Sequence, residues 1–183
     1  MQDYREFIDE VLVDEAALAK RVGELAAQID REYAGQELLV VCLLRGGLTF
    51  AADLTRALST TQTLDCMSLS SYGVGHYASS GNVRVNLDLM TNIEGLNVLL
   101  VEDIVDSGRT LAHVLDMLRT RNPKSLKVCV LLDKKYRREV PVQVDYVGFD
   151  VPDKYVFGYG IDIDEHYRHL KFIASADLQK YKK

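Results

Sequence analysis

Residues 98–110 read Val-Leu-Leu-Val-Glu-Asp-Ile-Val-Asp-Ser-Gly-Arg-Thr and join an apolar segment to a helical one. Four consecutive apolar residues (98–101) are typical of a strand that is covered on both faces, as in parallel sheets. Two acids follow, and then a third acid, a serine and a glycine lead into residues 110–120, whose apolar side chains recur at helical spacing. Ligands of such sheets bind at the carboxyl ends of the strands. The stretch therefore predicts an α/β sheet with a ligand site at this junction.

The rest of the chain repeats the alternation of strand and helix. A helix is expected after Asp14, which can cap it, because apolar residues from Leu18 to Ile29 follow at steps of four, three and four. Further strands are expected at 38–44, 64–69, 126–132 and 144–149, and a further helix at 48–58. Strands that alternate with helices predict a doubly wound α/β fold with a central parallel sheet.

The composition limits the class of protein. A chain of 183 residues with 48% hydrophobic and 27% charged residues is typical of one globular domain, here expected over residues 1–183. The formal net charge of −5 argues against a broad nucleic-acid or membrane-binding surface. Three cysteines, each in or beside an apolar stretch, predict buried free thiols in a reducing compartment. With no signal peptide and no apolar run of about 18 residues, we expect a cytoplasmic protein.

The junction at 102–110 has the chemistry of a sugar phosphate site. Backbone N–H groups of Ser107 to Thr110 are expected to face outward at a helix start, where the helix dipole favours an anion. Gly108 allows close approach of the backbone. Glu102 and Asp103 would repel a polyanion, so we expect them to meet hydroxyl groups or a divalent cation. A ligand with a phosphate, a diol and Mg²⁺ nearby fits both parts of the stretch: the phosphate suits residues 107–110, and the diol or Mg²⁺ suits Glu102 and Asp103.

Three other interpretations fit parts of this stretch. A Walker B segment also places acids after apolar residues, but the chain lacks the G-x-x-x-x-G-K-[ST] motif that would hold a nucleotide. An EF-hand fragment would need acids at alternating positions. A solvated acidic turn does not account for three acids, two hydroxyl residues and a glycine at one junction.

Residues 98–111 resemble the phosphoribosyl pyrophosphate loop of type I phosphoribosyltransferases, in the version of bacterial hypoxanthine–guanine enzymes. Further segments that match in the same order are 43–47, 70–73, 131–134, 147–153, 156–162 and 167–168. On these ordered matches the chain is identified as a member of the family. The resemblance implies an α/β fold with a central parallel sheet, flanking helices and a small hood. The hood would come from the N-terminal region and residues at about 150–175.

The resemblance implies Mg²⁺-dependent transfer of the phosphoribosyl group to N9 of hypoxanthine, and of guanine, with release of pyrophosphate. Asp106 is implied to be the catalytic base that takes a proton from the purine ring. Glu102 and Asp103 would hold the ribose hydroxyls and metal. The residues implied to bind phosphoribosyl pyrophosphate are Arg45, Gly46, Glu102, Asp103, Asp106, Ser107, Gly108, Arg109, Thr110 and Arg168.

The purine site implied by the resemblance has four residues. Lys134 would donate to the exocyclic O6, Tyr155 would stack on the base, and Val156 would offer backbone contacts to the purine edge. Asp162 would lie near the same edge and bind a second Mg²⁺, so the implied metal ligands are Glu102, Asp103 and Asp162.

Two loops are implied to handle pyrophosphate and water. Arg45-Gly46 corresponds to a loop that binds pyrophosphate and carries a cis peptide bond in the family; the sequence does not say whether the Arg45–Gly46 bond is cis. A polar, glycine-dotted loop is expected from Ser70 to Gly81. It would include Ser71 and Tyr72 and close as a lid, because water would hydrolyse an oxocarbenium-like sugar.

Alternatives stay open at this point. Hypoxanthine is favoured slightly over guanine, and xanthine is a further purine to consider. A phosphoribosyltransferase-fold regulator that binds RNA is a different class, which the net charge of −5 and the Glu102-Asp103 pair disfavour. We therefore expect small-molecule substrates, no nucleic-acid or membrane partner, and a homo-oligomer, either a dimer or a tetramer as in the family.

Overall fold

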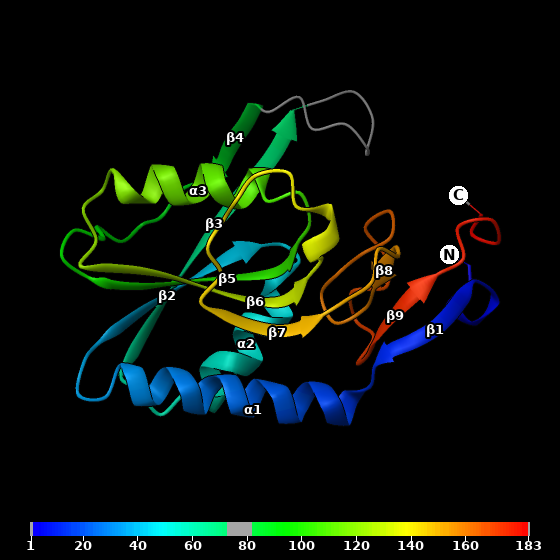
Figure 1. The fold of residues 1–183 in the computed structure, drawn as a ribbon, viewed down its shortest axis with the longest axis horizontal. Coiled ribbons are helices and arrows are strands. Elements are labelled where there is room, and N and C mark those ends of the chain that lie inside the picture. Colours follow the sequence, from blue (N-terminus) through cyan, green and yellow to red (C-terminus); the bar gives the residue numbers. More distant parts are fainter. Residues whose placement is uncertain (1, 73–81, 183) are drawn as a thin grey trace.

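The computed structural model describes residues 2–72 and 82–182, which form two sheets and three α-helices (Figure 1). The larger sheet has six strands in the order β4-β3-β2-β5-β6-β7. Their bounds are β2 Leu38–Leu44, β3 Gln62–Tyr72, β4 Asn82–Leu87, β5 Asn97–Val105, β6 Ser125–Asp133 and β7 Tyr146–Asp150. Neighbouring strands are parallel except β3 and β4, which are antiparallel. The predicted α/β fold with a central parallel sheet is confirmed.

Helices cover both faces of this sheet (Figure 1). Helices α1 (Glu15–Glu32) and α2 (Gly47–Ala57) lie on one face, and α3 (Arg109–Arg119) lies on the other. The even-numbered side chains of β2 from Leu38 to Cys42 pack with α1 and α2, whereas the odd-numbered ones from Leu39 to Leu43 pack with α3. Burial on both faces explains the unbroken apolar run.

Two strands, β5 and β3, extend well beyond their predicted ends. Glu102 and Ile104 pair with Val130 and Leu132 of β6, so β5 continues through the acids to Val105. β3 continues to Tyr72 because its last residues pair with β4. The prediction of a loop from Ser70 was therefore wrong for residues 70–72, and residues 73–81 of the expected lid lie outside the described residues. In both cases the strand was predicted to end with its apolar run, but main-chain pairing with the neighbouring strand continues through the polar residues that follow.

The smaller sheet has the order β1-β9-β8 and is antiparallel. Its strands are β1 Ile8–Val13, β8 Val156–Phe157 and β9 Ile173–Ala176. Phe7, Phe157 and Tyr167 pack beneath it with ring centroids 5.3–5.9 Å apart. These strands come from the segments from which a hood was expected, and we use that name for the small sheet and the loop at 158–170. The strands β2, β6 and β7 point toward the hood (Figure 1).

Short elements and free thiols complete the description. There are two 3-10 helices in the described residues. The first, η1 (Tyr4–Glu6), precedes the hood strand β1, and the second, η2 (Lys135–Arg137), follows β6. All three cysteines are free; Cys42 and Cys129 are buried as predicted, while Cys66 is partly exposed. Within the described ranges, no helix is both long enough and apolar enough to cross a bilayer.

Candidate active site

The loop between β5 and α3 has the backbone of an anion site. Gly108 has a φ of +83°, and a Cβ atom there would lie 2.7 Å from the carbonyl oxygen of Val140. Both facts require glycine. The Arg109 N–H donates to Ser107 Oγ at 3.4 Å, and α3 begins at this residue. The N–H groups of this first helical turn, with the helix dipole, favour a phosphate.

The segment after β6 holds this loop in place. The N–H groups of Glu139 and Val140 both donate to the carbonyl oxygen of Ser107, at 2.9 and 3.1 Å. The guanidinium of Arg109 pairs with the Glu139 carboxylate at 2.6 Å. Because the Arg109 side chain is held there, its backbone N–H is the group placed to meet a phosphate.

Asp106 lies between two cations at the mouth of this loop. Its Oδ2 is 3.9 Å from Lys134 Nζ, and its Oδ1 is 3.6 Å from Arg137 Nε. Arg137 also lies 3.4 Å from Asp153 Oδ1. Asp106 Oδ1 is buried, and no hydrogen-bond donor reaches it from the described part of the chain. Such an oxygen can accept a proton or a hydrogen bond from a ligand.

Lys134 is a buried donor and not a surface lysine. Only 6% of the residue is exposed. Burial lowers the pKa of its ammonium, although Asp106 and Asp153 act in the opposite direction. Close by in the sequence, Val156 is buried at the start of β8, and Tyr155 is partly exposed with its carbonyl oxygen accepting from Ala176 N–H at 2.8 Å. The structure places both residues at the hood.

The acid pair of β5 adjoins the turn after β2. Asp103 N–H donates to Glu102 Oε1 at 3.1 Å, and burial, with Asp103 next in effect, raises the pKa of Glu102 well above its usual range. A Cβ atom on Gly46 would lie 1.6 Å from Asp103 Oδ2, so the turn and the carboxylate are in contact. The cis peptide bond of this turn joins Leu44 to Arg45, one residue before the Arg45–Gly46 bond considered from the sequence.

The hood loop brings two arginines together. Arg168 donates to the Gly160 carbonyl oxygen at 2.8 Å and pairs with Asp162 at 2.8 Å and with Glu165 at 3.0 Å. The other oxygen of Glu165 meets Arg45 at 2.6 Å. The Arg168 hydrogen bond lowers the pKa of Glu165. Glu165 thus links Arg45 to Arg168, two of the three arginines predicted to bind phosphoribosyl pyrophosphate.

The family of the chain follows from comparison with known proteins. The model of the phosphoribosyl transferase domain matches residues 10–166. The chain belongs to the phosphoribosyltransferase family. The hypoxanthine phosphoribosyltransferase of Salmonella typhimurium is 46% identical over 92% of this chain and 96% of its own. The hypoxanthine-guanine phosphoribosyltransferase of Dictyostelium discoideum is 44% identical over 95% of this chain and 98% of its own.

A solved structure extends the likeness to three dimensions. A hypoxanthine-guanine phosphoribosyltransferase from Bacillus anthracis has a TM-score of 0.87 and 46% identity, covering 92% of this chain and 98% of that one. Predictions of the type I phosphoribosyltransferase fold and of an enzyme are both confirmed.

The predicted metal residues of this phosphoribosyltransferase form two separate sets. Across residues 2–72 and 82–182, no three His, Cys, Asp or Glu side chains converge as a metal site. Glu102 and Asp103 are one set, and Asp162, which also accepts from Glu165 N–H at 2.8 Å, is the other. Mg²⁺ is usually held by one or two carboxylates together with substrate phosphates. Two incomplete sets therefore fit ions that arrive with the substrate.

Sequence reasoning missed several residues of this phosphoribosyltransferase. Arg137 contacts Asp106 and Glu165 contacts Arg45, but both lie in stretches that resemble ordinary solvated charge clusters. Asp153, in the matching segment 147–153, pairs with Arg137. The position of Arg137, three residues after Lys134, was the available signal. Ser71 and Tyr72 end β3, and their role as a lid stays a prediction.

Proposed function

We propose that this enzyme salvages purines by transferring the 5-phosphoribosyl group of phosphoribosyl pyrophosphate to N9 of hypoxanthine or guanine. The products are the nucleoside monophosphate, IMP or GMP, and pyrophosphate. One observation carries the proposal: the buried Lys134 ammonium lies 3.9 Å from Asp106. Asp106 directly precedes the turn at 107–110 that is proposed to bind the phosphate. The names and close identity of the relatives support the same reaction.

Each part of the site has a task in this reaction. The N–H groups at 107–110 bind the 5′-phosphate, and Arg45 and Arg168 attract the pyrophosphate group. Lys134 donates to O6 of the purine, while Asp106 Oδ1, which accepts no hydrogen bond from the described residues, takes the proton from the ring. The N9–C1′ bond then forms as the bond from C1′ to pyrophosphate oxygen breaks.

We propose Mg²⁺ as the cofactor, held by Glu102 and Asp103 and, at a second position, by Asp162. Bound there, Mg²⁺ would neutralise the negative charge that develops on the departing pyrophosphate. The partial ligand sets support this, since substrate oxygens are expected to complete them.

Specificity for 6-oxopurines is proposed to come from Lys134. Its ammonium has only donors, so it matches the carbonyl oxygen of hypoxanthine and guanine. Adenine carries an amino group at that position and would leave the buried donor without an acceptor, at a cost of about 1–3 kcal/mol. Tyr155 adds stacking on the base, worth about 1–3 kcal/mol by analogy with other aromatic contacts to bases.

The test is nucleoside monophosphate formation from phosphoribosyl pyrophosphate and Mg²⁺, with hypoxanthine, guanine, xanthine, adenine and uracil offered separately. Turnover confined to hypoxanthine and guanine is expected, and the ratio of their kcat/KM values ranks the two bases. Turnover that does not occur without added divalent cation would support the Mg²⁺ proposal. No turnover with any base would contradict the proposal and favour a regulator. A homo-oligomer and a cytoplasmic location remain predictions.

A further inference from the structure

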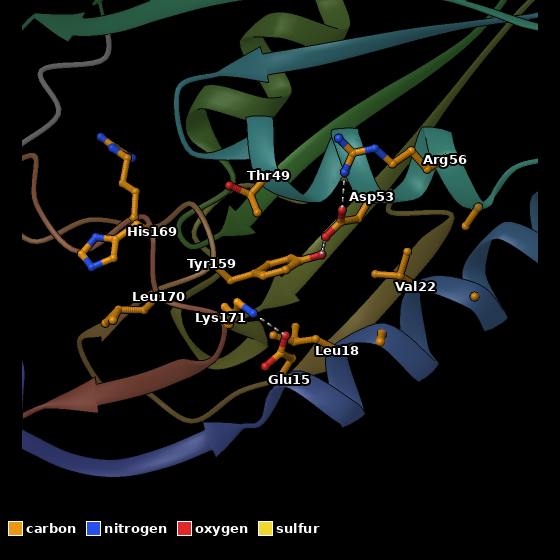
Figure 2. A pocket seen from close by; sticks show the side chains of 14 residues that line it. Glu15, Leu18, Val22, Thr49, Asp53, Arg56, Tyr159, His169, Leu170 and Lys171 are labelled. Carbon is orange, nitrogen blue, oxygen red and sulfur yellow. Dashed lines mark hydrogen bonds and ion pairs between the residues drawn. The ribbon is translucent and has the colours of Figure 1, made fainter.

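Tyr159 links the hood to helix α2 by a hydrogen bond that the sequence analysis did not anticipate. Its hydroxyl donates to Asp53 Oδ2 at 2.6 Å, and Figure 2 shows the ring reaching from the hood loop toward the helix. Only 7% of Tyr159 is exposed, and its φ is +51°. A tyrosine in the left-handed region is uncommon and persists where surrounding contacts hold it.

Each end of this hydrogen bond is close to residues proposed to bind pyrophosphate. Asp53 lies on α2, the helix that begins at Gly47 immediately after the Arg45-Gly46 turn. On the hood side, Gly160 follows Tyr159; its N–H donates to the Arg168 carbonyl oxygen at 2.9 Å and its own carbonyl accepts from the Arg168 guanidinium at 2.8 Å. The Tyr159–Asp53 hydrogen bond therefore joins α2, which follows Arg45, to the part of the hood loop that holds Arg168.

The backbones of the two segments also touch directly. A Cβ atom on Gly160 would lie 2.2 Å from the carbonyl oxygen of Gly46, so the two backbones are in close contact. The Arg45–Glu165 ion pair joins the same two segments at the turn, and the Tyr159–Asp53 hydrogen bond joins them on α2. Contacts at separate points fix the orientation of the hood loop, which a single contact leaves free.

The Tyr159 ring belongs to the hydrophobic core that α1 and α2 share with the sheet, but one side of its surroundings is open. An open pocket of about 610 Å³ lies between α1, α2 and the hood, with Leu18, Val22 and Leu170 on its walls (Figure 2). Tyr159 and Asp53 line the same pocket. Because this side of the ring is open, the hydrogen bond to a carboxylate, which is stronger than one between neutral groups, contributes to the spacing between the hood loop and α2.

We propose that Tyr159 and Asp53 are positioning residues for the pyrophosphate end of the active site. Their hydrogen bond sets the placement of Arg168 relative to the Arg45-Gly46 turn. The inference rests on the proposed function, since the pyrophosphate group is assigned there to Arg45 and Arg168. Neither residue is proposed to touch the substrate.

Tyr159→Phe tests this because it removes only the hydroxyl group. The dissociation constant of pyrophosphate and the KM for phosphoribosyl pyrophosphate are expected to rise about 5- to 20-fold, the lower part of the range for one hydrogen bond to a charged group. Affinity for IMP, which has the purine and the 5′-phosphate but no pyrophosphate, should stay within about twofold. Asp53→Asn keeps an acceptor for the tyrosine hydroxyl and is expected to restore most of the affinity lost in Asp53→Ala.

Lys171→Ala is the matched control. It removes the Lys171–Glu15 ion pair, which spans the same pocket at 3.2 Å between the residue after the hood loop and α1 (Figure 2). That pair is exposed and, among the contacts of the described residues, has no link to Arg168, so neither affinity should change. Thermal unfolding of each variant separates loss of binding from loss of folded protein.

Two results would overturn the proposal. One is an equal loss of pyrophosphate and IMP affinity in Tyr159→Phe, and the other is no loss of either. Should Tyr159→Phe fail to fold, the Asp53→Ala and Asp53→Asn pair gives the same comparison. Binding is measured by calorimetry on the intact protein and does not require turnover. A protein without turnover would therefore contradict the proposed function, while the binding comparison would still test the positioning role of Tyr159 and Asp53.

Discussion

Asp106 and Lys134 occupy equivalent positions after two neighbouring strands, and their charged groups lie 3.9 Å apart. Val105 of β5 pairs with Asp133 of β6, so the next residue of each strand emerges at the same level of the sheet. N7 and O6 lie on the same edge of a purine. The proposed base for N7 and the proposed donor for O6 are thus placed side by side by the register of one parallel pair.

Replacing Asp106 with Asn should remove proton acceptance and keep the shape of the side chain. We expect kcat to fall about 10²–10⁴-fold, the usual contribution of a general base, with residual turnover because charge stabilisation at the leaving group persists. Steady-state kinetics at saturating substrates gives the comparison.

Asp116→Asn is the control for this change, since Asp116 is exposed on α3 and pairs only with Arg119 in the described contacts. It should retain wild-type kcat. A loss of less than about fivefold in Asp106→Asn would show that Asp106 is not the base, because even weak general-base catalysis exceeds that factor.

Replacing Lys134 with Met should weaken the preference for 6-oxopurines. Removing the donor is expected to lower kcat/KM for hypoxanthine about 10- to 100-fold, as for a hydrogen bond from a charged group, and to affect adenine much less. Stability should not fall, because burial already lowers the pKa of the ammonium and so disfavours its charged form in the fold. Kinetics with both bases and urea denaturation measure these effects.

Lys135→Met provides the comparison, because Lys135 is 60% exposed and pairs with Asp150 away from Asp106. It should leave the ratio of kcat/KM for hypoxanthine and adenine unchanged. If Lys134→Met kept the wild-type ratio, O6 recognition would have to come from another group.

The central sheet could be predicted from the sequence because its strands are buried on both faces. The run at 38–44 matched β2 to the residue, and Asp14 caps α1 by accepting from Ala17 N–H at 2.8 Å, as expected. The hood strands could not be predicted in the same way. β8 has two residues and β9 has four, too few to show a period.

The site divides along similar lines. Residues in one contiguous segment, such as Glu102, Asp103 and Asp106, could be found because their chemistry is crowded into a single junction. Contacts between distant segments could not: Tyr159 and Asp53 are 106 positions apart, and no local pattern marks either of them. Tertiary contacts of this kind depend on how the hood meets α2, which periodicity does not encode.

Asp30 gives a prediction for the dependence of stability on pH. Desolvation would raise its pKa, but hydrogen bonds from Ser59 and Thr60 at 2.7–3.0 Å outweigh this, and the pKa lies below its ordinary value. A lowered pKa in the fold means that the unfolded chain binds the proton more readily. The stabilisation is therefore complete above the unfolded pKa of about 3.9 and is lost as the pH falls through the folded value.

Asp30→Asn should accordingly reduce the free energy of unfolding by about 1–2 kcal/mol at pH 7, allowing for partial exposure of the site. The difference from wild type should shrink at pH 3.5. Urea denaturation at both pH values measures it, with Asp116→Asn expected to change stability by less than about 0.5 kcal/mol at either pH. A penalty that is the same at both would mean that shape, and not charge, is what Asp30 contributes.

Gly46→Ala should separate the geometry of the active site from the stability of the fold. Gly46 has φ −59° and ψ −41°, which alanine adopts without strain, so the obstacle is Asp103, whose Oδ2 would lie 1.6 Å from the new Cβ. The carboxylate must move to make room. A misplacement of about 1 Å in an active site can lower the rate about 100-fold. We therefore expect kcat/KM for phosphoribosyl pyrophosphate to fall by about that factor, while the unfolding midpoint changes little.

Gly23→Ala is the matched control, since Gly23 is exposed on α1 and a Cβ there meets no atom within 4 Å. It should keep full activity and raise the free energy of unfolding by about 0.5–1 kcal/mol, the difference in helix propensity between the two residues. Together the two variants distinguish a lost backbone conformation from a displaced carboxylate. Wild-type activity in Gly46→Ala would show that Asp103 can leave its place beside the turn without cost, and its assignment to the ribose and metal would then be wrong.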